Sequence, residues 1–160
     1  MATALQDVSV RRLAAGDGDL ARALFSTMAV VFETRSEPLR NAYIDRLLGS
    51  SSFWAIAAFE GEDITGGLTA HTLPMTSGER AEIFIFDIAV REARQRQGVG
   101  RRLVAALLES AACEGMGVVF VPADNEDTHA LDFYHALGGQ ASPVTFFTFD
   151  VQSQMVGGEK

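Results

Sequence analysis

The 160-residue sequence predicts an α/β fold, in which strands and helices alternate along the chain. Residues 83–90 form a β-branched and aromatic run of strand length, broken only by Asp87, which predicts a strand buried on both faces. Apolar residues then recur at helical spacing from 103 to 111. Residues 53–59 and 64–73 read as two strands on either side of a turn, which is typical of a β-hairpin.

The other elements follow from the same periodicities. We expect a strand at 8–13, a helix from 17 or 19 to 33, a helix from 36–38 to 49, a short strand at 117–123, a helix at 128–137 and a final strand at 144–150. Gly66 and Gly67, inside the second strand of the hairpin, indicate a bulge or a close backbone approach. The polar segment 33–38 is a candidate substrate-side loop.

Length and composition favour one domain over residues 1–151, with a disordered tail at 152–160. We expect a cytoplasmic protein without a membrane partner, because no signal-peptide core and no apolar run of ~20 residues is present. Cys113, the single cysteine, is expected to be inert on the apolar side of its helix. No Cys/His cluster has the spacing of a metal site, so no metal is expected.

Charge is concentrated in one place. The chain carries a net −8, yet residues 91–102 contain five arginines and one glutamate. A nucleic-acid partner is disfavoured, since an acidic chain of pI ≈ 4.8 repels a polyanion outside that segment. A small phosphorylated cofactor suits a local basic patch better.

The basic segment surrounds Gly98-Val99-Gly100, between a predicted strand and a predicted helix. A helix N-terminus offers unpaired N–H groups and the positive end of the helix dipole, so a phosphate is held there. The segment lacks the Gly-Lys-Ser/Thr of a P-loop, and Leu103 occupies the place of the third glycine of a dinucleotide fingerprint. The pattern therefore predicts a pyrophosphate loop of another kind, or else a solvated strand-to-helix connection.

The segment 95–100, QRQGVG, resembles the Q/R-x-x-G-x-G/A motif of the GNAT family of N-acetyltransferases, which binds the pyrophosphate of acetyl-CoA. The order of the predicted elements is also similar to that family. The resemblance implies a mixed, mostly antiparallel central sheet, splayed at the acetyl-CoA site and flanked by about four helices. It implies that the strand at 83–90 carries a bulge and that the pantetheine arm pairs with its backbone. The cofactor residues would be Ile88, Ala89, Val90, Gln95, Arg96, Gln97, Gly98, Val99, Gly100 and Arg101.

A narrower resemblance covers over half of the chain. Residues 53–74, 83–90, 121–127 and 130–139 are similar to class I aminoglycoside 3-N-acetyltransferases, the gentamicin and fortimicin resistance enzymes. The resemblance implies acetylation of the 3-amino group of a deoxystreptamine ring and a homodimer formed through the C-terminal strands. The sequence departs from that group at Glu126, Thr128 and His129, which bears on the range of drugs more than on the reaction.

Two residues are candidates for catalysis. Tyr134 stands where the family commonly supplies a tyrosine near the cofactor sulfur, and a phenol can protonate the departing thiolate. The alternative is a half-buried core tyrosine beside Phe133. Asp87 could accept the proton of the amine or bind a substrate ammonium. It could instead pair with an arginine or stand at a bulge.

Asp124, Glu126 and Asp127, together with Asp87, are candidates for binding a polycationic substrate, since closely spaced carboxylates attract and orient ammonium groups. Asp127 fits the N-cap of the following helix equally well. Three functions remain open: aminoglycoside N3-acetylation, acetylation of another amine such as a polyamine or a peptide N-terminus, and a non-catalytic acyl-CoA-binding module. Complete motifs in the loop and around Tyr134 argue against the third.

Overall fold

The computed structural model describes residues 8–152, and the chain divides after Pro122 into two units. The elements of the first unit are β1 (Val8–Arg12), α1 (Gly18–Val31), α2 (Asn41–Gly49), β2 (Phe53–Glu60), β3 (Asp63–Pro74), β4 (Ala81–Val90), the 3₁₀ helix η2 (Glu92–Arg94), α3 (Val99–Cys113) and β5 (Val119–Phe120). The second unit contains α4 (Thr128–Ala136). Residues 153–160, which hold nearly all of the predicted tail, lie outside the described residues.

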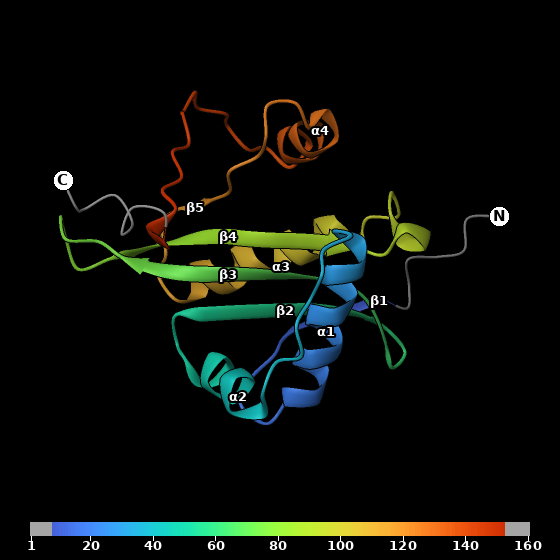
Figure 1. The fold of residues 1–160 in the computed structure, drawn as a ribbon. Helices are drawn as coiled ribbons and strands as arrows, with labels where there is room; N and C mark the ends of the chain where they lie inside the picture. The colour runs from blue at the N-terminus through green and yellow to red at the C-terminus, as the bar shows by residue number, and fades with distance from the viewer. Residues whose placement is uncertain (1–7, 153–160) are drawn as a thin grey trace, which may run out of the picture. The chain divides into compact units, whose positions relative to one another are not determined.

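The five strands form one sheet in the order β1-β2-β3-β4-β5, and every pair is antiparallel except β4 and β5. Helix α1 crosses one face of this sheet and α3 lies on the other (Figure 1). With α2 and α4, the described residues contain four α-helices, so the predicted mixed, mostly antiparallel sheet and the predicted number of helices are confirmed.

Side-chain alternation divides the core of the first unit into two layers. Ala55 and Ala57 of β2 pack in one cluster with Leu24 of α1. Because successive side chains point to opposite faces, Trp54 and Ile56 belong to the other layer, on the side of α3. These four β2 side chains are all buried.

Two glycines let α1 and β4 approach the middle of β3. A Cβ on Gly67 would lie 2.1 Å from Leu24 Cδ1, and a Cβ on Gly66 would lie 2.7 Å from the carbonyl oxygen of Ala89. The register also shifts between Ala58 and Phe59, at the level of Thr65. Both the close approach and the bulge predicted for this stretch are therefore confirmed.

The second helix begins later than predicted. It starts at Asn41 instead of 36–38, because the chain stays extended through Arg40 (φ −70°, ψ 147°). Arg22 of α1 holds this extended segment by donating from Nη1 to the carbonyl oxygen of Leu39 and from Nη2 to Asn41 Oδ1, each at 2.6 Å. A long-range tether therefore overrides the local helix-start signal of Ser36, Glu37 and Pro38.

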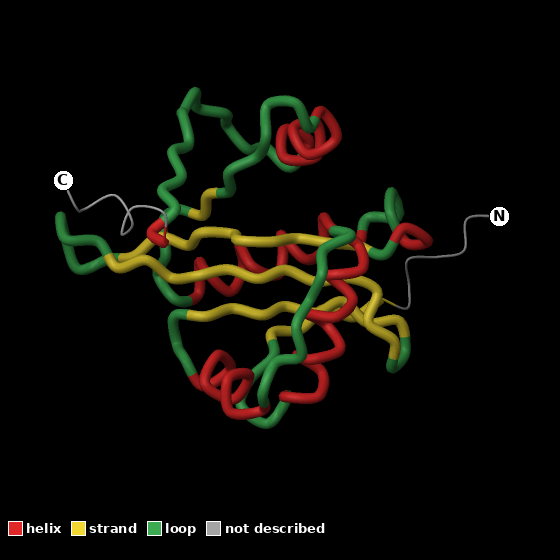
Figure 2. The backbone as a smooth tube through the Cα atoms, viewed as in Figure 1, coloured by secondary structure: helices red, strands yellow, loops and turns green. Residues whose placement is uncertain are grey.

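Four other expectations were wrong. Strand β4 is not buried on both faces, since Phe86 is 61% exposed. Cys113 is exposed rather than part of the core. Strand β5 spans only Val119–Phe120, and the described residues after α4 contain no strand (Figure 2). The apolar segment 144–150 has strand-like composition, but a strand needs a partner ladder, and the described part of the second unit supplies none.

No helix among residues 8–152 combines the length and the apolar content needed to cross a bilayer.

Candidate functional site

A one-residue bulge in β4 places Asp87. Thr69 of β3 pairs with Asp87, but Ala70 pairs with Ile85, so Phe86 is the extra residue. In a strand of the same sequence without a bulge, strict alternation would place the Asp87 side chain on the α3 face together with the buried Ile83 and Ile85. The bulge moves Asp87 to the α1 face, which confirms the bulge that the resemblance implied.

Asp87 is a partly buried carboxylate that makes no hydrogen bond or ion pair within residues 8–152. Of the two structural alternatives, the arginine partner is therefore wrong and the bulge is correct. Burial raises the pKa of Asp87 above its ordinary value. A carboxylate in this state either binds a cation or takes a proton more readily than an exposed aspartate does.

The loop between β4 and α3 has the predicted form. Gly98, at the N-cap of α3, adopts a left-handed conformation with φ 84°, and Arg96 also has a positive φ of 60°. The side chains on either side of Arg96 fasten the loop to its own backbone: Gln95 Nε2 donates to the carbonyl oxygen of Val90, and Gln97 Nε2 to that of Ala93, each at 3.0 Å. The first N–H groups of α3 have no acceptor within the helix.

The five arginines of this segment divide into two groups. Three are engaged with the protein: Arg94 pairs with Glu60 at 2.5 Å, Arg102 donates to the carbonyl oxygen of Val8, and Arg91 lies 3.5 Å from Thr27 Oγ1. Arg96 and Arg101 are exposed and make no such contact with any described residue. These two side chains, with the N–H groups of Gly98, Val99 and Gly100, suit a diphosphate.

The end of β4 presents an open backbone edge. Ile88, Ala89 and Val90 pair on one side with Leu68, Gly67 and Gly66 of β3. On the other side, β5 pairs only with Ile83 and Phe84, so no described strand covers the last part of β4 there. An extended amide-containing chain can add to such an edge, as the predicted pantetheine contact requires.

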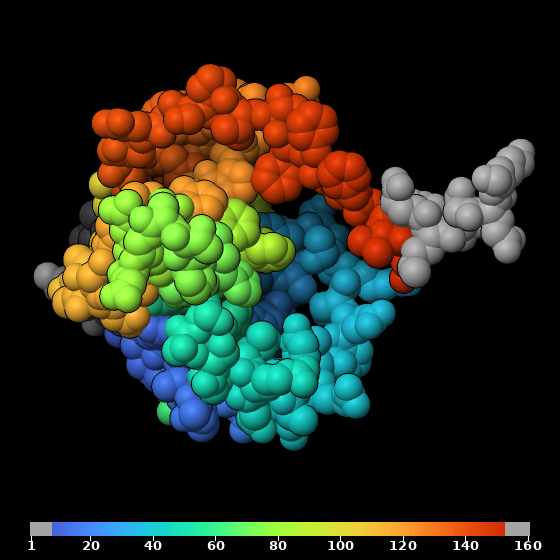
Figure 3. All heavy atoms as spheres, turned by 90° about the vertical axis from the view of Figure 1, so that its left-hand side faces the viewer, coloured from blue at the N-terminus to red at the C-terminus, as the bar shows by residue number. Residues whose placement is uncertain are grey.

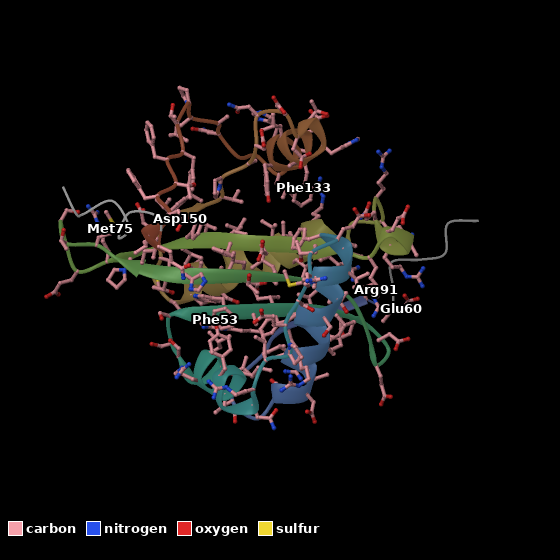
Figure 4. The ribbon with its side chains drawn as sticks, viewed as in Figure 1. Phe53, Glu60, Met75, Arg91, Phe133 and Asp150 are labelled. Carbon is pink, nitrogen blue, oxygen red and sulfur yellow. The ribbon has the colours of Figure 1, made fainter. Side chains whose placement is uncertain are left out.

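An open pocket of about 880 Å³ lies beside this loop, on the α1 side. Its wall includes Thr27 and Val31 of α1, Ile64 of β3, and Arg91 and Gln95 from the loop. Figure 4 shows Arg91 and Glu60 at the same end of the sheet, opposite the end where Phe53 begins β2. Sequence reasoning did not find this pocket, since it depends on the packing of α1 against the hairpin.

In the second unit, the acidic stretch opens α4. Asp127 Oδ1 accepts a hydrogen bond from the N–H of Ala130 at 3.0 Å, so Asp127 is the N-cap. Asp124 Oδ1 accepts from the N–H of Glu126 at 2.9 Å, which shapes the turn before the helix. All three carboxylates are exposed. The capping alternative is therefore confirmed for Asp127, while binding of a substrate by this stretch stays a prediction.

Tyr134 is half-buried, and its ring contacts that of Phe133 at a centroid distance of 5.1 Å. Burial, and then the charge of Asp127, raise the pKa of Tyr134 above that of a free phenol. The side chain therefore remains protonated at neutral pH and can act as a proton donor.

Sequence reasoning also missed a run of aromatic contacts on the α1 face of the sheet. His71 of β3 lies between Phe53 of β2 and Phe86 of β4, with ring centroids 5.5 and 5.8 Å away. Phe84 and Phe86 read as core residues in an apolar strand. Whether these two rings are buried or exposed depends on the bulge, and the position of the bulge cannot be found from composition alone.

The described residues hold no group of three His, Cys, Asp or Glu side chains that could bind a metal.

Residues 19–138 match the family described as "Acetyltransferase (GNAT) family". No curated protein matches the chain.

Two solved structures are similar to the chain over most of its length. One is an aminoglycoside acetyltransferase from an uncultured soil metagenomic sample, in complex with trehalose; it is 30% identical, with a TM-score of 0.88 over 92% of this chain and 98% of that one. The other, an aminoglycoside acetyltransferase also from such a sample, is 37% identical, with a TM-score of 0.84 over 90% and 98%. A structure of the first enzyme in complex with sisomicin gives 29% identity and a TM-score of 0.87 over 91% and 97%.

Proposed function

Because the chain belongs to the acetyltransferase (GNAT) family, we propose that it acetylates aminoglycosides at the 3-amino group of their deoxystreptamine ring. The observation that carries the proposal is the 37% identity, over 90% of the chain, to an aminoglycoside acetyltransferase. The position of the amine comes from the resemblance of residues 53–74, 83–90, 121–127 and 130–139 to class I 3-N-acetyltransferases.

Acetyl-CoA supplies the activated acetyl group as a thioester. The residues that would hold it are those of the glycine-rich loop and the open edge of β4. Arg96, Arg101 and the N–H groups at the start of α3 would bind the diphosphate, because they are the donors there that no residue of 8–152 engages. The backbone of Ile88, Ala89 and Val90 would pair with the amide-containing arm.

Asp87 would bind the attacking amine. An aminoglycoside amine is largely protonated in water, and it must lose a proton before it can act as a nucleophile. A half-buried carboxylate with a raised pKa and no partner among the described residues can hold the ammonium and accept its proton, directly or through a water. In this assignment Asp87 is both the anchor and the general base.

Tyr134 would give a proton to the departing thiolate. Its raised pKa keeps the phenol protonated at the pH at which the amine reacts. The exposed carboxylates Asp124, Glu126 and Asp127 would attract the remaining ammonium groups of the acceptor, in addition to the cap that Asp127 provides.

We extend the proposal to a homodimer. Four apolar side chains of the second unit are exposed by about three quarters: Val144, Phe146, Phe147 and Phe149. Such a concentration of exposed aromatic surface is typical of an interaction site. Sedimentation equilibrium tests the proposal. A monomer at about 50 µM, which is well above the Kd of a stable interface, would refute it.

The function is tested by release of coenzyme A thiol with gentamicin, sisomicin, kanamycin, spermidine and an N-terminal peptide, with the products mapped by NMR. Turnover of deoxystreptamine drugs with acetylation at N3 is the expected result, and expression in a susceptible bacterium should raise resistance to the same drugs. Turnover with spermidine or the peptide alone would refute the aminoglycoside assignment, and acetyl-CoA binding without turnover would refute catalysis.

A further inference from the structure

Five aromatic side chains, here called the aromatic row, run across the α1 face of the sheet from β2 to β5. Consecutive ring centroids in the row lie 5.5, 5.8, 5.9 and 5.3 Å apart. The members, in spatial order, are Phe53, His71, Phe86, Phe84 and Phe120. Figure 4 shows Phe53 at the beginning of β2, where the row starts.

The row is open to solvent at its middle and at its β5 end. Phe86 is 61% exposed and Phe120 is 40% exposed, although both belong to the sheet. An aromatic side chain on a strand face is ordinarily buried, and its exposure is therefore informative. Phe86 is also the bulge residue, so the irregular position of the strand carries an exposed ring.

The exposed ring adjoins the unpaired carboxylate. Phe86 and Asp87 together oppose Thr69 of β3, so both side chains emerge from the same position in the ladder. His71, two residues from Thr69 on the same strand and face, packs against Phe86 with the two ring planes at 82°. One carboxylate therefore stands beside two aromatic rings, all within the first unit.

We propose that Phe86, against which His71 packs nearly at a right angle, is a stacking platform for a saturated, ammonium-bearing ring of the acceptor, whose charged amine is held by Asp87. The inference rests on the proposed function, and it adds the selection of cyclic over linear amines. An aromatic face attracts both an ammonium group and the C–H bonds that the ammonium polarises. A rigid ring covers such a face without losing rotamer freedom, whereas a linear polyamine must be ordered to do so.

The experiment measures binding without acetyl-CoA, so that its result does not depend on turnover. Sisomicin is titrated into the protein by calorimetry, and its ring protons are followed by NMR. For the wild-type chain we expect upfield ring-current shifts on one sugar ring. Phe86→Leu, which keeps an apolar side chain, should remove the shifts and weaken sisomicin binding about 3- to 30-fold. The Kd of spermidine should change less than twofold.

Two further variants control for structure. Phe32→Leu removes a ring that is 41% exposed at the end of α1 and outside the row, and it should leave sisomicin binding unchanged. His71→Phe keeps an aromatic ring and should bind sisomicin like the wild type, whereas His71→Leu should weaken it. Unfolding midpoints of all variants are compared first. Only variants whose midpoint lies within about 3 °C of the wild type are compared, since such a variant is still folded at the temperature of the titration.

The experiment can refute the platform without refuting the proposed function, and the proposed function without refuting the platform. Wild-type sisomicin binding without ring-current shifts, or with an unchanged Kd in Phe86→Leu, would overturn the platform even if sisomicin were acetylated. Failure of sisomicin to bind would overturn it as well. Ring-current shifts that disappear in Phe86→Leu, together with no acetylation of any aminoglycoside, would support the platform and refute the proposed reaction.

Discussion

Asp87 lies directly opposite Thr69 in the β3–β4 ladder, and Phe86 stands beside it as the extra residue of a bulge. If the same sequence paired without a bulge, Asp87 would share a face with Ile83 and Ile85, which are buried on the side of α3. The bulge thus determines which residue of β4 meets the solvent side of the α1 face. The site depends on this single irregularity as much as on the identity of the aspartate.

The role of Asp87 predicts a pH-dependent loss of activity. Asp87→Asn should lower kcat/KM for an aminoglycoside by about 10²-fold or more, because the amine loses both its anchor and its proton acceptor. The acidic limb of the wild-type kcat/KM profile should lie above the range of an exposed aspartate, since burial raises the pKa of Asp87. The variant should lack this limb. An unchanged limb in Asp87→Asn would assign it to another group.

The same raised pKa of Asp87 predicts that Asp87→Asn, which lowers activity, raises the stability of the fold at neutral pH. The folded chain binds a proton at Asp87 more tightly than the unfolded chain, so this stabilisation is present below pH 3.8 and is lost as the pH rises through the folded-state pKa. At pH 7 the ionised carboxylate is therefore unfavourable in the fold. Asp87→Asn should raise the thermal unfolding midpoint at pH 7. A lower midpoint at pH 7 would show that the carboxylate has a stabilising partner in solution.

Tyr134→Phe tests the proton donor. The substitution should reduce kcat by about 10²-fold while the Kd of acetyl-CoA stays within twofold, because only the departure of the thiolate loses its acid. The chain contains one other tyrosine, Tyr43, which is 41% exposed on α2. Tyr43→Phe is therefore a matched control and should leave kcat unchanged. Equal kcat values for the two variants would leave Tyr134 with only the packing role beside Phe133.

The unengaged arginines predict how coenzyme A binds. Arg101→Gln should raise the Kd of coenzyme A by about 3- to 10-fold, since it removes one charge-assisted contact to the diphosphate. The difference from the wild type should shrink as salt is added. Arg35→Gln changes an exposed arginine in the α1–α2 connection and serves as the control. Calorimetric titration with coenzyme A gives both values, and equal affinities for the two variants would place the diphosphate elsewhere.

The parts of the fold that depend on short stretches of sequence were predictable. The hairpin, the glycine-rich loop and the helix after it follow from periodicity and from glycine placement, and the structure has all three. The start of α2 was not predictable in this way, because Arg22, which belongs to another helix, holds residues 39–41 extended. The segment 144–150 failed for a related reason: strand propensity does not supply a partner strand.

The candidate site, like the fold, was predictable from the sequence only in part. Asp87 was identified because a carboxylate inside an apolar run needs an explanation, and the structure gives one in the bulge. The aromatic row was not identified, since phenylalanines in a strand are read as core unless the register is known. Figure 3 views the first unit from the end where β3 leads into β4, with residues near 50 (teal) directly below residues near 75–80 (green). The N–H of Thr72 donates to the carbonyl oxygen of Ser52 at 2.8 Å in this region. Which residues become neighbours there depends on the register of the strands and not on composition.

Gly67 gives the sharpest test of the packing that supports the site. A Cβ there would lie 2.1 Å from Leu24 Cδ1 and 2.9 Å from the carbonyl oxygen of Ile56, and Leu24 is fully buried. Since neither the helix nor the strand can move without disturbing the α1 layer, Gly67→Ala should destabilise the fold by about 1–3 kcal/mol.

The matched control is Gly49→Ala, because Gly49 ends α2 and a Cβ added there would meet no described residue within 4 Å beyond its own helix and chain neighbours. It should be neutral or stabilise the fold by up to about 1 kcal/mol, through a better helix propensity. Urea unfolding followed by circular dichroism gives both free energies. Equal values for the two variants would mean that α1 does not approach β3 at Gly67 in solution, and that the pocket between α1 and the glycine-rich loop has a different shape.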